Sequence, residues 1–195
     1  MKLINIQIFD KWTDSWVRAE LWENPGNDYI ETTQDLWSLY REHYLQELQA
    51  AGKSAPEHNH WNWKEKLKWH ENSLYDCFAI VHNDAPQGLM MVKHGRSKLP
   101  QQRDQPLVYV EFLESAPWNL KGYCDVPRYS AVGRRLYEAA AQFSRSLGFD
   151  GRIGLRSLPG AETFYEQRGM KSLILPGEHL TYFESVADSS TRKKQ

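Results

Sequence analysis

Long apolar runs are missing from this 195-residue sequence, and no stretch approaches the roughly 18 consecutive apolar residues of a membrane helix. Charge of one sign is not in excess either, because 24 Lys and Arg stand against 25 Asp and Glu, which gives a formal net charge of -1. Proteins that hold nucleic acid by electrostatic attraction usually carry a strong basic excess. We therefore expect neither a membrane partner nor a nucleic-acid partner.

Cysteine is scarce, with only Cys77 and Cys124, which lie far apart in the sequence and form no metal-ligand spacing. This usage is typical of a reducing compartment. Residues 1–10 also lack the apolar core and small-residue cleavage site of a signal peptide, so we expect a cytoplasmic protein. No metal site is predicted, because zinc-type i,i+4 pairing with a carboxylate is absent around His60, His70, His82 and His94.

The length and the 41% of hydrophobic residues fit one domain with a buried core. Residues 3–9 are rich in β-formers and partly alternate, which predicts an opening strand. Residues 10–27 give no clear pattern. Thr32 or Thr33 is a candidate N-cap for a helix that ends before Gly52.

Helical patterning continues through a second predicted helix over residues 61–71 and then changes to strand patterning. Residues 76–82 and 89–93 are typical of two antiparallel strands, joined by turn chemistry at residues 83–88. Residues 107–114 have strong β character and predict a further strand.

An amphipathic helix is predicted over residues 132–147, and Gly148 is a usual residue just after a helix end. Four short elements follow it, a strand, a helix and two closing strands, over residues 153–158, 161–168, 173–175 and 179–184. This order of elements predicts an α/β (α+β) fold in which helices flank a sheet.

The most informative segment lies at the start of this amphipathic helix, at residues 128–135. Backbone N–H groups at a helix start, together with the positive end of its dipole, form an anion site. Small residues let a phosphate approach the backbone, and arginines add charge-assisted contacts: Ser130, Ala131, Val132 and Gly133, with Arg128, Arg134 and Arg135. The same pattern also fits a helix start with closely packed small residues and solvated arginines.

The segment resembles the pyrophosphate loop of the GNAT superfamily of N-acetyltransferases. That loop has Gln or Arg, two residues, Gly or Ala, one residue, then Gly or Ala, and this chain supplies Arg128, Ala131 and Gly133. In the strand before it, the positions of the family's Leu-x-Val-x-Pro pattern hold Leu113, Ser115 and Pro117.

Downstream, residues 157–170 are similar to the family's last motif. Its Ala, Phe/Leu-Tyr-Glu and Gly-Phe signature is matched by Ala161, Phe164, Tyr165, Glu166, Gly169 and Met170, whereas Ser157 stands near a common Asn. The resemblance covers about 64 residues, from 107 to 170. Three partial motifs in the right order are more specific than any one of them.

The resemblance implies a mixed, mostly antiparallel central sheet with acyl-CoA held where two central strands splay apart. It implies direct transfer of an acetyl group from acetyl-CoA to a primary amine, with no metal. The implied cofactor-binding residues are Leu113, Ser115, Arg128, Ser130, Ala131, Val132, Gly133, Arg134, Arg135 and Ser157. Residues 117–128 form a longer connection than usual, which would either shape the acceptor pocket or pack as a surface loop.

Three residues are candidates for proton transfer. By the resemblance, Tyr165 lies where many GNAT enzymes place the acid that protonates the CoA sulfur, although a packing role is also open. Glu111, a carboxylate within an apolar strand, is the first candidate for the base. Glu114, on the opposite strand face, is the second. A structural ion pair is the alternative role for Glu111.

The expected domain covers residues 1–186. Residues 1–72, a strand and two helices, would form a cap, residues 75–184 the cofactor-binding core, and residues 187–195 a flexible tail. Two other functions stay open: a non-catalytic acyl-CoA-binding protein, and a toxin-like transferase directed at protein or tRNA. A homodimer is compatible with the sequence, which does not identify the acceptor amine.

Overall fold

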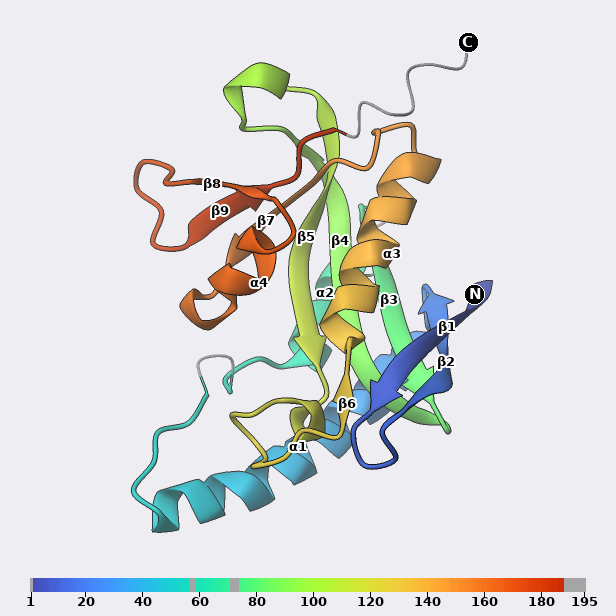
Figure 1. Cartoon of the computed structure of the whole chain (residues 1–195), viewed down its shortest axis with the longest axis vertical. Helices are drawn as coiled ribbons and strands as arrows, with labels where there is room; N and C mark the ends of the chain where they lie inside the picture. Colours follow the sequence, from blue (N-terminus) through green and yellow to red (C-terminus); the bar gives the residue numbers. More distant parts are fainter. Residues whose placement is uncertain (1, 57–58, 71–73, 188–195) are drawn as a thin grey trace. The chain divides into compact units, whose positions relative to one another are not determined.

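The computed structural model describes residues 2–56, 59–70 and 74–187 (Figure 1), so residues 188–195 of the predicted tail and the end of the predicted helix at residue 71 lie outside the described residues. The chain divides into two compact units. The first comprises Met1–Met91 and Leu113–Leu136, and the second Val92–Phe112 and Tyr137–Gln195.

The first unit opens with an antiparallel hairpin of β1 (Lys2–Asp10) and β2 (Ser15–Glu23). The strand β2 was not predicted, because the turn between β1 and β2 contains no glycine or proline. Within this turn Asp14 takes the positive φ, at 50°. Ala19 and Leu21 are buried and alternate with more exposed neighbours, which is the pattern of a half-buried strand.

Two central strands of this unit meet at a tight turn. β3 (Tyr75–His82) and β4 (Ala85–Arg96) are joined by Asn83 and Asp84, whose φ values of 49° and 58° suit a two-residue primed turn. The predicted turn over residues 83–88 is therefore too long, because the second strand already begins at Ala85. The strand order is β6-β1-β2-β3-β4, with β6 (Tyr129–Ser130) on the edge.

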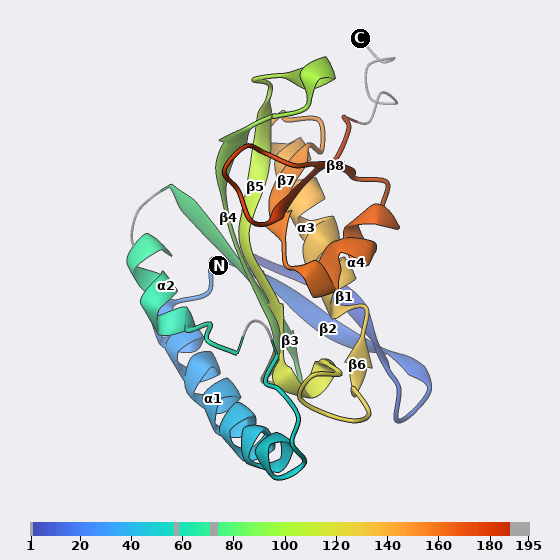
Figure 2. The same cartoon turned by 90° about the vertical axis from the view of Figure 1, so that its left-hand side faces the viewer.

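The helices of the first unit are α1 (Asn27–Ala50) and α2 (Trp63–His70), which lie on the same side of β3 (Figure 2). The predicted N-cap at Thr32 or Thr33 is wrong, because the cap is Gly26. Both threonine hydroxyls instead donate to the carbonyl four residues earlier, inside the helix.

The second unit holds the later part of β4, the strand β5 (Pro106–Ser115) as far as Phe112, and the strands β7 (Ile153–Ser157), β9 (Thr181–Glu184) and β8 (Lys171–Leu173), in the order β4-β5-β7-β9-β8. Its helices are the later part of α3 (Val132–Ser146) and the short α4 (Glu162–Glu166). The predicted helix over residues 161–168 is shorter than expected, because a 3-10 turn at Pro159–Ala161 precedes it.

The strands β5 and β7 pair in parallel over only three positions, from Val108↔Ile153 to Val110↔Leu155. β5 continues past the last pair to Ser115, and β7 continues to Ser157. Among the described residues the fold is therefore a mixed, mostly antiparallel sheet of nine strands with four α-helices, as predicted from the sequence.

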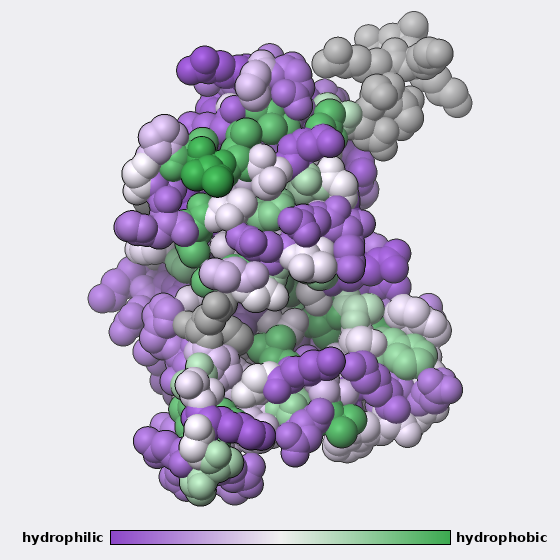
Figure 3. Space-filling view, turned by 60° about the vertical axis from the view of Figure 1, so that its left-hand side comes forward, coloured by the Kyte–Doolittle hydropathy of each residue, from purple (hydrophilic) through white to green (hydrophobic). Residues whose placement is uncertain are grey.

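Apolar residues on the surface lie in separate groups. Hydrophilic residues dominate the face in Figure 3 and surround these groups. No helix among the described residues is both long enough and apolar enough to span a bilayer.

Candidate functional site

The start of α3 is held close to β4 by Gly88. A Cβ atom at this position would lie 2.7 Å from Val132 Cγ1 and 3.1 Å from Leu136 Cδ1, so any larger residue would push the helix start outward. Gly88 therefore determines where the first turn of α3 sits on the strand.

The turn before α3 is made by Ala131, which adopts the left-handed region with a φ of 68°. The first helical hydrogen bond runs from the Arg135 N–H to the Ala131 carbonyl, at 2.9 Å. The N–H groups of Val132 and Gly133 have no partner among the described residues. Ser130 precedes the turn and pairs with Phe9 in the sheet. These are the features of an anion-binding helix start.

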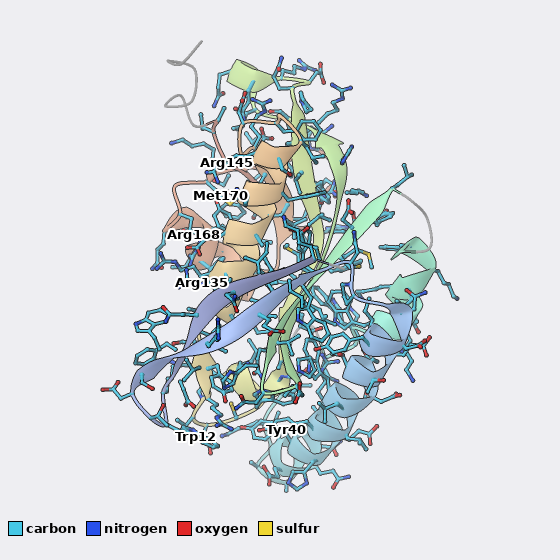
Figure 4. The ribbon with its side chains drawn as sticks, turned by 90° about the vertical axis from the view of Figure 1, so that its right-hand side faces the viewer. Trp12, Tyr40, Arg135, Arg145, Arg168 and Met170 are labelled. Atoms are coloured by element: carbon cyan, nitrogen blue, oxygen red, sulfur yellow. The ribbon has the colours of Figure 1, made fainter. Side chains whose placement is uncertain are left out.

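Two of the predicted arginines contact the hairpin. The Arg128 guanidinium lies 4.5 Å from the Trp12 ring and 4.8 Å from the Tyr129 ring, and its Nη2 lies 3.5 Å from Asp10 Oδ2. Arg135, labelled with Trp12 in Figure 4, donates from Nε to the Gln7 carbonyl at 2.8 Å. Arg134 is exposed in the first turn. The backbone N–H groups are thus the part of this segment best prepared for an anion.

The end of β5 carries the predicted residues Leu113, Glu114 and Ser115. Leu113 and Ser115 are half-buried, whereas Glu114 points to the opposite face and is 3% exposed. Arg41 Nη2 donates to Glu114 Oε1 at 2.5 Å, and Trp63 Nε1 donates to Oε2 at 2.7 Å. Both carboxylate oxygens therefore have partners from α1 and α2.

Burial shifts the pKa values of Glu114 and Lys66 in the directions that favour their uncharged forms. It raises the pKa of Glu114 to about 7, against the opposing effects of Arg41, Trp63 and Lys66. It also lowers the pKa of Lys66, whose Nζ lies 5.1 Å from the centroid of the Trp61 ring. Burial therefore makes the Glu114 carboxyl easier to protonate than an exposed glutamate.

Glu111 belongs to the second unit and forms an ion pair, with 2.6 Å between its Oε2 and Lys93 Nζ. Lys93 Nζ also lies 5.3 Å from the centroid of the Tyr109 ring. The Tyr109 hydroxyl accepts a hydrogen bond from Arg156 Nη1 at 3.0 Å. The ion pair that the sequence left open is present, and the Glu111 side chain is 21% exposed.

Tyr165 lies in α4, is 7% exposed, and packs edge-on against Phe164 and obliquely against Phe183. Burial raises its pKa to about 12, with the Arg168 guanidinium acting in the opposite direction. The Tyr165 hydroxyl has no hydrogen-bond partner among the described residues. Ser157 is buried at the end of β7, where its hydroxyl donates to the Leu158 carbonyl at 2.8 Å.

The long connection before α3 is ordered by side-chain hydrogen bonds within the first unit. Trp118 Nε1 donates to Gln87 Oε1 at 2.9 Å, and the Tyr129 N–H donates to Asn119 Oδ1 at 2.9 Å. Tyr123 is fully buried, and its hydroxyl donates to Asn59 Oδ1. The segment is therefore held in place by contacts within the first unit.

Sequence reasoning did not find the cluster around Glu114, although one signal was available. Arg41 lies on the buried stripe of α1, four residues after Trp37 and seven before Leu48. A cation at such a position needs a buried anion. The tryptophans of α2 were interpreted as packing residues only, yet Trp63 is also a hydrogen-bond donor.

No protein-family model matches the chain, and no curated protein sequence matches it. Solved structures do match. A protein described as a GNAT-family acetyltransferase, from Desulfovibrio desulfuricans, superposes with a TM-score of 0.54 at 12% identity, over 87% of this chain and 99% of that one.

Two further structures are similar. A tetramutant of the BH1408 protein from Bacillus halodurans has a TM-score of 0.53 at 17% identity, covering 81% of this chain and 97% of its own. An acetyltransferase from Thermus thermophilus has a TM-score of 0.50 at 16% identity, covering 85% of this chain and 96% of its own. The chain therefore has the fold of the GNAT acetyltransferases.

Proposed function

We propose that the protein is an acyl-CoA-dependent N-acetyltransferase that moves an acetyl group from acetyl-CoA to a primary amine by direct attack. The observation that carries this proposal is the start of α3, where Ala131 turns in the left-handed region and two backbone N–H groups have no partner among the described residues. On a GNAT fold, such donors suit the pyrophosphate of acyl-CoA.

In this proposal the pyrophosphate accepts hydrogen bonds from the N–H groups of Val132 and Gly133, with the Ser130 hydroxyl nearby in sequence. Arg128, Arg134 and Arg135 add positive charge around the same turn. Leu113, Ser115 and Ser157, at the ends of β5 and β7, complete the proposed cofactor-binding residues. No metal is required for these contacts.

Tyr165 is proposed as the general acid. A phenol with a pKa of about 12 keeps its proton at neutral pH, and its hydroxyl is not engaged elsewhere among the described residues. The amine nitrogen attacks the thioester carbonyl, the carbon–sulfur bond breaks, and the departing thiolate takes the Tyr165 proton. A base takes the proton that the amine loses, and the proposed candidates are Glu111 and, as the second choice, Glu114.

The cysteines favour direct transfer over an acyl-cysteine intermediate. Burial raises the pKa of Cys77 to about 12, and it also raises the pKa of Cys124. Because the thiolate is the nucleophilic form, both side chains are poor nucleophiles at neutral pH.

The proposal is tested by measuring acetyl-CoA consumption over a panel of amines with wild-type protein and with Tyr165→Phe. We expect kcat to fall by roughly 10²-fold or more for Tyr165→Phe, while the Kd for acetyl-CoA stays nearly unchanged. Tyr137→Phe is the matched control, because Tyr137 is another tyrosine whose pKa burial raises, and it should keep wild-type turnover.

The possible results separate the open functions. A wild-type protein that binds no acyl-CoA contradicts the whole proposal. Binding without turnover of any amine, peptide or tRNA acceptor would identify a non-catalytic acyl-CoA-binding protein. Turnover only with a macromolecular acceptor would identify the toxin-like alternative, and equal turnover of Tyr165→Phe and Tyr137→Phe would exclude Tyr165 as the acid.

A further inference from the structure

The first unit contains a pocket of about 400 Å³ that shares Arg128 with the proposed cofactor-binding residues and is otherwise not used by the proposed chemistry. Its walls come from the β1–β2 turn, α1, the β3–β4 turn and the connection before α3. Figure 4 labels two of its residues, Trp12 from the hairpin turn and Tyr40 from α1. Its volume lies within the range of roughly 300–1,000 Å³ that is usual for small-molecule sites.

Four aromatic side chains line this pocket: Trp12, Tyr40, Trp118 and Tyr129. Trp118 packs edge-on against Tyr40, with 5.5 Å between the ring centroids. Trp12 is 66% exposed, and Val126 on another wall is 64% exposed. Large apolar side chains therefore border the pocket from two separate loops. Such exposed apolar side chains at a concave site mark a place where a ligand would be buried.

The pocket also offers polar groups without intramolecular partners. His82 Nδ1 lies 2.7 Å from the Arg18 carbonyl, which can only accept, so this nitrogen donates and Nε2 is left as an acceptor. The hydroxyls of Tyr40 and Tyr129 have no hydrogen-bond partner among the described residues. Arg128 Nε is buried and also lacks one. These groups can meet both donors and acceptors on the edge of a ring.

The charge of the pocket is nearly balanced. Arg128 is the one cation among its lining residues, and the buried Asp10 carboxylate lies 3.5 Å from its guanidinium. The amide of Gln87, although it lines the pocket, already accepts from Trp118 and Asn119 and donates to Ala85. The pocket therefore requires neither an anionic nor a cationic ligand, and flat aromatic walls favour a planar one.

We propose that this pocket binds a planar, uncharged heteroaromatic ring, packed against the aromatic side chains of Trp12, Tyr40 and Trp118 and hydrogen-bonded at its edge by His82 and Tyr129. Two sources could supply such a ring. One is the adenine of acyl-CoA, a possibility that rests on the proposed function. The other is a free heteroaromatic compound, such as an amine that carries an indole ring.

The experiment measures Kd by calorimetry for coenzyme A, 4′-phosphopantetheine, adenosine and tryptamine, with wild-type protein, Trp12→Ala and Tyr40→Leu. If adenine is the source, Trp12→Ala raises the Kd for coenzyme A by roughly 5-fold or more, which is the scale of one lost stacking contact. The same variant then leaves the Kd for 4′-phosphopantetheine unchanged. If a free aromatic compound is the source, the same loss appears for tryptamine, including with protein saturated with coenzyme A.

Trp69→Ala is the matched control, because Trp69 is another exposed tryptophan, lies on α2, and is not a lining residue of the pocket. It should leave every Kd unchanged. Equal affinities of wild type, Trp12→Ala and Tyr40→Leu for adenosine, tryptamine and coenzyme A would overturn the proposal. Absence of coenzyme A binding to the wild type would instead contradict the proposed function. The adenosine and tryptamine measurements would still show whether the pocket binds a heteroaromatic ring.

Discussion

Glu111 and Glu114 are three residues apart on β5 and have different surroundings. Glu111 is partly exposed and paired with Lys93, whereas both oxygens of the buried Glu114 accept hydrogen bonds from Arg41 and Trp63. A base must be able to reach the proton that it takes. This favours Glu111 as the proposed base, with Glu114 as a structural carboxylate.

At the residue scale we therefore predict that Glu111→Gln lowers kcat by roughly 10²-fold or more and changes the pH profile of the acetyl transfer. Glu114→Gln should retain most of the turnover. The measurement is kcat against pH for wild type and both variants. The pKa of Glu114 is raised to about 7. If the plot of kcat against pH has a limb near pH 7 that is lost only in Glu114→Gln, then Glu114 is the base instead.

At the scale of elements, the junction between β6 and α3 holds an alanine where glycine is the easier residue. A left-handed conformation costs a non-glycine residue roughly 1–2 kcal/mol, so replacing the residue by glycine removes this cost. Glycine also has more conformational freedom in the unfolded chain, which offsets about half of the stabilisation. Ala131 takes this conformation with its φ of 68°. The strain lies in the turn that precedes the proposed anion donors.

We predict that Ala131→Gly raises the free energy of unfolding by roughly 0.5–1 kcal/mol, measured by urea denaturation. Ala139→Gly, the same change within the body of α3, should lower it by about 1 kcal/mol or more. If both variants are destabilised to the same degree, then position 131 does not carry the inferred strain.

At the scale of the whole molecule, one buried carboxyl links folding to pH. Burial raises the pKa of Glu114 from 4.5 to about 7, so the folded chain keeps this proton over a range in which the unfolded chain loses it. The stabilisation from this group is complete below about pH 4.5 and is lost as the pH rises through about 7.

We predict that the free energy of unfolding of the wild type, taken relative to Glu114→Gln, is largest near pH 4.5 and declines toward pH 8. Chemical denaturation of both proteins at a series of pH values measures this difference, because the other titrating groups are common to both. A difference that is constant over this range, or that grows with pH, would show that Arg41 and Trp63 outweigh the effect of burial.

Local patterns in the sequence were sufficient for most elements of this fold. Alternation and apolar periodicity predicted β1, β5, β7 and α3, because each presents a regular buried face. The order of motifs indicated the GNAT fold. The strand β2 and the start of α1 were not predicted correctly, because their turn and cap lack the usual residues and depend on sheet pairing and helix packing.

The sequence by itself determined the class of fold, the helix start at residues 130–133 and the position of Tyr165 in its motif, because these depend on neighbours along the chain. Only the tertiary structure decided that Arg41 and Trp63 meet Glu114, that Lys93 pairs with Glu111, and that four aromatic residues line one pocket. The partners in each of these groups come from different elements. Burial, pairing and pKa shifts are properties of such contacts, and no local pattern encodes them.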